Sequence, residues 1–320
     1  MLLVVDNNDG TYTCEVPDGK YEYIVSKEGY FQNEGTVEVD GVNVDVFVEL
    51  EEDFSYCANL LGSGSLSGTD ITWKICSDTE TLFIFGTGVI PDNISGEWKS
   101  YDDSFINLVI ENGITTIGDY AFSGCFNLVK VNIPDSVTSI GNSAFHNCNS
   151  LSEIIIPEFV TTIGHYAFQY CHGLITLNIP NSITSIGIGV FCDCSNLLEI
   201  TIPHGITIIG NSTFYGCTSL VNVNIPDSVT HIGESAFDNC VSLIEIVIPY
   251  LVTFEYGIFY NCISLSKITN YALTPQPIQI GDDIFLNVDT STCVLEVPSE
   301  SLSLYQTAEV WEDFQNIVGI

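Results

Sequence analysis

The sequence repeats with a period of 23 residues through the middle of the chain, and this repeat limits the chain to one kind of architecture. Phenylalanine, cysteine and glycine recur in phase, in columns that begin at Phe122, Cys125 and Gly118. Several columns in phase over six repeats do not arise by chance, and such a short period is typical of a solenoid of stacked coils. A proline column accompanies them at Pro134, Pro157, Pro180, Pro203, Pro226 and Pro249.

Each repeat begins with a short strand. In the second full repeat, Leu128, Val131 and Ile133 have the L-x-x-L-x-L spacing of a leucine-rich repeat. Side chains alternate between the two faces of a strand, so these three are expected to point inward together. The proline that follows ends strand pairing because it has no N–H group to donate.

The rest of each repeat predicts a second extended stretch and a turn. Residues 136–141 read as extended and end at Gly141, where glycine permits a positive φ. Residues 142–145 predict a short helical turn that carries Phe145 into the core. One such coil cannot bury its own apolar face, so stacked coils must share one core and both ends need caps.

The repeat columns resemble a known family. The motif I-P-[DN]-S-[VI]-T-S-I-G-x-x-[AV]-F-x-x-C-x-x-L-x-x-[IV], present at Ile133–Ile154 and Ile225–Ile246, is similar to the BspA-like leucine-rich repeats of the Treponema pallidum type. The resemblance covers residues 105–285, which correspond to about eight coils. It implies an α/β solenoid, mainly β, that forms a right-handed leucine-rich-repeat superhelix with short helical turns.

The flanking segments resemble the caps of that family. Residues 71–88 are similar to the β-hairpin that precedes such arrays, so we assign 54–104 to an N-terminal β cap. Residues 294–298 predict a last strand, and 304–317 resemble the family's closing helix. We therefore assign 286–320 to a C-terminal cap of strand and helix.

The N-terminal segment 1–53 differs from the repeats. It contains short alternating strands separated by tight turns, and it is similar to bacterial Ig-like or carboxypeptidase-regulatory-like domains. Such domains have strands ahead of the point where this sequence begins. We therefore expect a partial β-sandwich unit and a chain truncated at Met1.

Charge narrows the classes of partner. The chain has 41 acidic residues against 6 lysines and no arginine, which gives a formal net charge of -35. Such a chain repels phosphate backbones and anionic lipids, so we expect neither nucleic-acid binding nor binding to a membrane surface. No run of 18 apolar residues predicts membrane insertion, and the sequence as given carries no export signal.

The cysteine column predicts a ladder of buried thiols that act as small hydrophobic groups. Equivalent side chains in adjacent coils point in parallel, which suits neither a disulfide nor a converging metal site. Cys192 lies in a variable column and is expected to be exposed. Cys57 and Cys76 bracket the N-terminal cap and could pair if the protein is exported.

No pattern in the sequence predicts catalysis. The nucleophile-elbow, zincin, P-loop and dinucleotide-binding motifs are all absent from it. The histidines fall in five different columns, which disfavours a metal or catalytic cluster. We therefore predict a non-enzyme with no cofactor, no metal and no catalytic residue. These histidines are His146, His165, His172, His204 and His231.

The outward face of the L-x-x-L-x-L strands is the candidate binding surface. These outward polar columns, together with the threonine column that starts at Thr115, could instead form a hydrogen-bonded Thr/Asn ladder that stabilises the stack, and the two roles are compatible. The predicted surface comprises Lys130, Glu153, Thr176, Glu199, Asn222, Glu245, Lys267, Asn132, Asn178 and Asn224.

The resemblance implies a function outside the cell. The BspA-like family occurs in bacterial surface proteins and in some protists, so we expect a secreted or cell-surface protein. Its expected role is recognition or adhesion as a monomeric solenoid, with a protein or glycan as partner. The alternative is an intracellular protein–protein interaction scaffold, which would suit the many unpaired cysteines.

Overall fold

The computed structural model describes residues 57, 59–101, 103–278 and 281–320, together with the backbone of four earlier strands. The chain forms two compact units, Met1–Asn59 and Leu60–Ile320. In the first unit, β1 pairs antiparallel with β2, and β3 pairs antiparallel with β4. The predicted sandwich unit over 1–53 lies mostly outside the described residues. The strands are β1 (Val5–Asp6), β2 (Tyr12–Thr13), β3 (Gly19–Val25) and β4 (Asn33–Val39).

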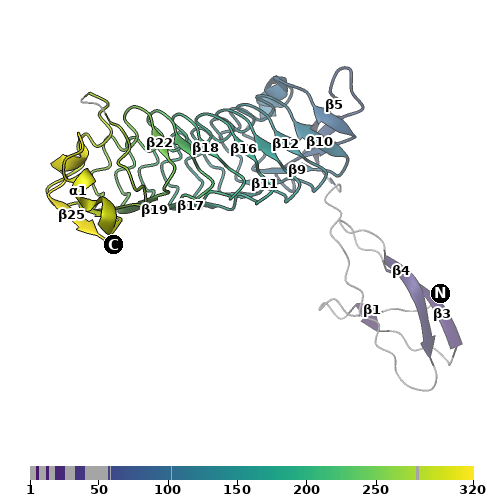
Figure 1. The fold of residues 1–320 in the computed structure, drawn as a ribbon. Helices are drawn as coiled ribbons and strands as arrows, with labels where there is room; N and C mark the ends of the chain where they lie inside the picture. Colours follow the sequence, from purple (N-terminus) through teal and green to yellow (C-terminus); the bar gives the residue numbers. More distant parts are fainter. Residues whose placement is uncertain are drawn as a thin grey trace. The chain divides into compact units, whose positions relative to one another are not determined.

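The second unit is a mainly β solenoid of about ten turns with little helix. Figure 1 shows its coils side by side along one axis, from β5 to the yellow C-terminal segment. The L-x-x-L-x-L strands form the first ladder, in which neighbouring strands pair in parallel within three successive sheets. Its strands are β7 (Thr81–Phe85), β9 (Asn107–Ile110), β11 (Lys130–Asn132), β13 (Glu153–Ile155), β15 (Thr176–Leu177), β17 (Glu199–Thr201), β19 (Asn222–Asn224), β21 (Glu245–Ile248), β23 (Lys267–Asn270), β24 (Val294–Val297) and β25 (Asn316–Gly319).

The next extended stretch of each coil forms the second ladder, whose strands also pair in parallel and make two successive sheets. Proline separates the two ladders in the six coils from Pro134 to Pro249, as its missing N–H predicts. The strands of the second ladder are β8 (Gly88–Ile90), β10 (Ile114–Ile117), β12 (Ser139–Ile140), β14 (Thr162–Ile163), β16 (Ser185–Ile186), β18 (Ile208–Ile209), β20 (His231–Ile232) and β22 (Thr253–Phe254).

The third side of each coil is a run of turns where a short helical turn was expected. Alternate N–H groups bond in two directions there. Those of Tyr120 and Phe122 donate to the carbonyls of Asn142 and Ala144 in the next coil, at 2.9 and 2.8 Å, whereas Ser123 N–H donates within its own coil to Tyr120. In an α-helix, by contrast, the N–H groups donate to carbonyls of the same segment. The turns therefore help to join successive coils.

The glycine column has a different physical reason from the one predicted. Gly141 and Gly164 do not adopt a positive φ. A Cβ atom on Gly164 would instead lie 2.6 Å from the carbonyl carbon of Gly141. Glycine is required here because the backbones of neighbouring coils approach too closely for any side chain.

Aromatic rings form the centre of the core. Trp98 and the phenylalanine column stack through the solenoid, with neighbouring ring centroids 5.2–5.9 Å apart and ring planes within 15°. Trp311 closes the stack edge-on against Phe285, at 5.3 Å. All these rings are buried. They make each coil dependent on its neighbours for the burial of its largest side chain.

The cysteine column is buried as predicted. The structure adds a repeated contact that the sequence did not reveal: six thiols of the column each lie 3.1–3.2 Å from the phenylalanine carbonyl of the preceding coil and donate to it. The pairs are Cys148 with Phe122, Cys171 with Phe145, Cys194 with Phe168, Cys217 with Phe191, Cys240 with Phe214 and Cys262 with Phe237.

The N-terminal cap is an antiparallel meander of β5 (Leu60–Ser65), β6 (Thr72–Cys76) and β7, whose far edge pairs in parallel with β9. Trp73 packs edge-on against Trp98 and Tyr101 over the first coil. Two short 3-10 helices, η1 (Ile94–Gly96) and η2 (Lys99–Tyr101), follow the meander.

The C-terminal cap corrects the expected closing helix. Only α1 (Leu302–Tyr305) is α-helical, flanked by the 3-10 helices η3 (Ser299–Ser301) and η4 (Trp311–Asp313). The last strand is β25, in which Ile317 pairs with Leu295 of β24, so the first ladder continues past the predicted end. An added strand satisfies the backbone groups of β24, which a helix could not do.

We expect the central ring of the aromatic stack to be essential. Phe191→Ala removes a ring stacked between Phe168 and Phe214, and the free energy of unfolding should fall by about 3–5 kcal/mol. Urea denaturation followed by circular dichroism measures this. The matched control Phe126→Ala removes an exposed ring and should change stability by less than about 0.5 kcal/mol. Equal effects of the two variants would contradict a stack-dependent core.

We also expect steep alkaline destabilisation. Burial raises the pKa of the thiols of Cys171, Cys194, Cys217, Cys240 and Cys262 above the ordinary value of 9.0. Above pH 9 the unfolded chain therefore binds fewer protons than the folded chain. Stability present below that pH is lost as the pH rises, at about 1.4 kcal/mol per thiol per pH unit.

Urea midpoints measured between about pH 8 and pH 11 test this loss. Tyrosine ionisation contributes to the same range, so Cys171→Ala serves as the comparison. The stability that this variant loses per pH unit should be smaller than in the parent chain, by the contribution of one thiol. Identical slopes would show that this buried thiol does not carry the effect.

Candidate binding surfaces

The outward face of the first ladder contains all ten residues of the predicted surface. Nine of them are exposed, whereas Lys267 is half-buried. The parallel register aligns them in rows, with Lys130 beside Glu153 and Glu245 beside Lys267. They form one face, and their role in binding remains a prediction.

Both lysines of this face have carboxylate partners. Lys130 Nζ lies 3.4 Å from Glu153, and Lys267 Nζ lies 3.1 Å from Glu296 in β24. Thr269 also donates a hydrogen bond of 2.7 Å to Glu296. That bond is the main cause that lowers the pKa of Glu296; burial opposes it, and Lys267 lowers the pKa further. The two pairs leave the centre of the face, from β15 to β21, with no lysine.

An aliphatic row borders this centre, and the sequence reasoning missed it. Ile175, Leu198 and Ile244 are 52%, 44% and 48% exposed, and Val221 between them is half-buried. Backbone N–H groups of Leu198, Val221 and Ile244 each donate to the carbonyl of the preceding member, at 2.8–3.3 Å. The sequence does contain a signal for this row: the column just before the outward strand position is aliphatic in four consecutive coils.

The second ladder has the threonine ladder that the sequence predicted. Hydroxyl groups donate to the threonine carbonyl one coil back over 3.1–3.4 Å, at Thr138, Thr161, Thr184, Thr230 and Thr253. These bonds join adjacent coils, so the column is explained by coil stacking without any partner.

A groove of about 580 Å³ runs across the second ladder from β10 to β18. Asn142 and His165 line it, and both are engaged in the stack. Asn142 Oδ1 accepts the N–H of His165, and His165 Nδ1 accepts the N–H of Ile188, each at 2.8 Å. These wall groups therefore hold successive coils together.

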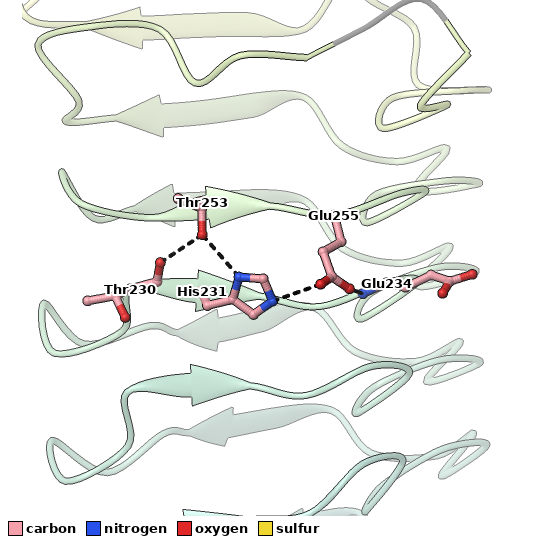
Figure 2. A network of polar contacts seen from close by, with 5 residues as sticks. All are labelled: Thr230, His231, Glu234, Thr253 and Glu255. Atoms are coloured by element: carbon pink, nitrogen blue, oxygen red, sulfur yellow. Dashed lines mark hydrogen bonds and ion pairs between the residues drawn. The ribbon is translucent and has the colours of Figure 1, made fainter.

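His231 joins two coils where the repeat loses one residue (Figure 2). Its Nδ1 lies 3.0 Å from Thr253 Oγ1, and its Nε2 lies 3.2 Å from Glu255 Oε1. Thr253 donates its own proton to the Thr230 carbonyl, and Glu255 also accepts the N–H of Glu234. Both ring nitrogens thus face acceptors, so the group resembles a triad only in its residue types, because the hydroxyl proton does not point to the histidine.

Two cysteine expectations have structural outcomes. Cys192 was expected to be exposed, but it is buried between Gln169 and Asp193, whose side chains lie 3.4 Å from its sulfur. Burial, followed by the charge of Asp193, raises the pKa of the Cys192 thiol to about 12. Cys57 and Cys76 are both disulfide-bonded, so neither is available as a thiolate ligand.

A further group on the turn side escaped the sequence reasoning. We define the aromatic–acidic cluster as Tyr170, Asp193, Tyr215 and Asp238, one from each of four consecutive coils. The N–H of Asp193 donates to the carbonyl of Tyr215 at 2.6 Å, and backbone bonds also join Tyr170 to Cys192 and Gly216 to Asp238. The cluster therefore follows the solenoid axis.

The backbone of Tyr170 breaks the rule of its column. Its φ is +61°, a left-handed conformation that costs most residues free energy but suits glycine, asparagine and aspartate. The other members of the column are all of those three types. This departure was the signal in the sequence. Those members are Gly124, Asn147, Asp193, Gly216, Asn239, Asn261 and Asn287.

The electrostatics of the cluster are negative. The charge of Asp193 is the main cause that raises the pKa of Tyr170. Burial raises the pKa of Tyr215, with smaller contributions from Asp238 and Asp193, and burial also raises the pKa of Asp238. Two tyrosine rings, 37% and 36% exposed, thus lie in the field of two aspartates.

The stacked coils and their L-x-x-L-x-L ladder define a leucine-rich-repeat protein. A family model described as "BspA type Leucine rich repeat region (6 copies)" matches residues 100–220 and 185–308. The chain therefore belongs to the BspA-type leucine-rich-repeat family. Leucine-rich-repeat proteins are protein-interaction modules and are typically non-enzymatic.

Three solved structures are similar to this chain. The T. pallidum leucine-rich repeat protein TpLRR is 25% identical, with 63% of this chain and 91% of that chain covered and a TM-score of 0.49. A leucine-rich repeat protein from Eubacterium ventriosum is 24% identical, with 75% and 79% covered and a TM-score of 0.43. One from Bacteroides ovatus is 30% identical, with 68% and 66% covered and a TM-score of 0.37.

No curated protein matches the sequence at a significant level. In the described part of the chain, no helix has the length and apolar character needed to cross a membrane.

The electrostatic assignment of the cluster can be tested by titration. Asp193→Asn removes the charge that chiefly raises the pKa of Tyr170, so this pKa should fall toward the ordinary value of 10.0. Nuclear magnetic resonance of labelled tyrosine rings follows each phenol separately. Asp238→Asn is the matched control, because it should lower the pKa of Tyr215 and leave that of Tyr170 almost unchanged. The opposite pattern would show that the two aspartates lie elsewhere.

Proposed function

We propose that the chain is a non-catalytic recognition protein that binds a protein partner through the outward face of the first ladder. The observation that carries this proposal is the exposed aliphatic row beside the polar outward positions. Ile175, Leu198 and Ile244 expose about half of their surface in adjoining coils, next to Thr176 and Glu199. Aligned apolar groups with a polar border are typical of an interaction surface.

The size of the face supports a protein partner. Parallel strands are about 4.8 Å apart, so seven coils extend the face over roughly 30 Å. Covering one aliphatic side chain contributes about 1.5–3 kcal/mol, and a specific interface buries more than about 1,000 Å² in total. Ile155 on β13 and Val247 on β21, 80% and 42% exposed, extend the apolar surface along the same ladder.

Display outside the cell is part of the proposal. The BspA-type repeat supports it through the surface proteins in which the family occurs. The disulfide-bonded state of Cys57 and Cys76 supports it as well, because disulfides persist in oxidising compartments. Adhesion is the form of recognition that these two observations favour.

The binding face can be tested on protein and glycan arrays probed with the whole chain. The double variant Leu198→Ser and Glu199→Ala should weaken binding to a protein partner by about tenfold or more, because both residues lie at the centre of the face. Leu251→Ser with Glu158→Ala is the matched control, since both of these residues are also exposed but follow the proline column. It should bind like the parent chain.

Two outcomes would contradict the proposal. Equal binding by the two double variants would remove the first ladder as the site. Binding to glycans alone would replace the protein partner with a carbohydrate. Circular dichroism on both variants should show the parent fold, because each change is on an exposed side chain.

A further inference from the structure

The aromatic–acidic cluster has negative charge without a counter-ion. Neither Asp193 nor Asp238 forms an ion pair with any residue that the structure describes. The Cys192 thiol lies 3.4 Å from Asp193 Oδ2, and a thiol is a weak donor. Asp238 is half-buried, and burial of a carboxylate without a counter-ion costs free energy.

The coil that follows Asp193 leaves space for the carboxylate of Asp193. A Cβ atom on Gly216 would clash with Asp193 Oδ1, so the carboxylate lies over the one residue without a side chain. Backbone bonds from Tyr170 to Cys192 and from Asp193 to Tyr215 put Asp193 in the coil between those of the two tyrosines. Behind Tyr170, the His146 ring packs edge-on at 5.6 Å and supports it.

The chemistry of the cluster favours a planar cation. Aromatic faces attract cations, and a carboxylate between two rings adds charge and hydrogen-bond acceptors. A guanidinium group stacks on an aromatic ring and donates to a carboxylate in the same plane, which an ammonium group does less well. A neutral sugar would leave the aspartates without a counter-charge. The chain itself contains no arginine, so the cation must come from a partner.

We propose that the aromatic–acidic cluster binds an arginine side chain of a basic protein partner, with Asp193 as its carboxylate and Tyr170 and Tyr215 as its aromatic walls. The cost of the left-handed Tyr170 backbone fits this role, because asparagine would satisfy the turn but provide no ring. The net charge of -35 would attract a basic partner over a distance. The site lies on the turn side of the coils and goes beyond the proposed function of the first ladder.

The test uses the whole chain and a short blocked peptide, glycine apart from one central arginine. Its binding is followed by the nuclear magnetic resonance signals of the tyrosine rings. The signals of Tyr170 and Tyr215 should shift on addition of the peptide. Tyr170→Asn and Asp193→Asn should each weaken binding by about threefold to tenfold. Asparagine occupies the same column at Asn147 and Asn239, so Tyr170→Asn should fold at least as well as the parent chain.

Controls separate a specific site from general attraction to an acidic protein. Glu158→Gln removes the same unit of charge from an exposed position outside both proposed surfaces and should leave peptide binding unchanged. The peptide with citrulline in place of arginine should not bind, because citrulline has the shape of arginine without its charge. The lysine peptide should bind more weakly than the arginine peptide.

Three results would overturn the proposal. The first is an equal loss of binding in Glu158→Gln and Asp193→Asn, which would reduce the effect to long-range attraction. The second is equal binding of the arginine and citrulline peptides, which would indicate a site for neutral groups. The third is a response of the two tyrosine signals to Ca²⁺ but not to the arginine peptide, which would indicate a metal site. The first-ladder variants are scored on arrays, so the two proposals can fail separately.

Discussion

The stacking of each coil on its neighbours is the interaction on which the rest of the structure depends. A single 23-residue coil has no interior, and its phenylalanine ring is buried only because a ring from each adjacent coil covers it. The same close approach excludes side chains at the glycine column and directs six thiols of the cysteine column to a phenylalanine carbonyl one coil back. The first and last coils of the solenoid have a neighbour on one side only. Trp73 and Trp311 cover these two ends with large apolar side chains.

Most polar groups of the solenoid serve this stacking. Threonine hydroxyls bond to carbonyls one coil away, and Asn142, His165 and Glu255 accept backbone N–H groups of adjoining coils. A polar column that satisfies the neighbouring coil is explained by stacking alone. The aliphatic row of the first ladder and the aromatic–acidic cluster are different, because stacking does not require exposed isoleucine or the tyrosine at position 170. Both are therefore candidate surfaces.

The periodic part of the fold was predictable, because the columns fix which face of each strand is buried. Much of the remainder depends on contacts between coils. The turn segment bonds across to the next coil and so is not helical, and Cys192 is buried by Gln169 of the preceding coil although its column is variable. The last cap residues add a strand where a helix was expected, because Ile317 completes the ladder at Leu295. The outward first-ladder face was predicted from alternation, whereas the cluster was missed because its four residues occupy two different columns.

The sequence by itself determined the coil: its length, its inward residues, its proline break and the family to which it belongs. Those properties follow from local spacing, since a strand alternates its faces whatever surrounds it. Only the tertiary structure decided which side chains meet across coils, because equivalent residues 23 positions apart become neighbours only after stacking. That step joined Tyr170 to Asp193 and Tyr215, and it directed His231 to Glu255.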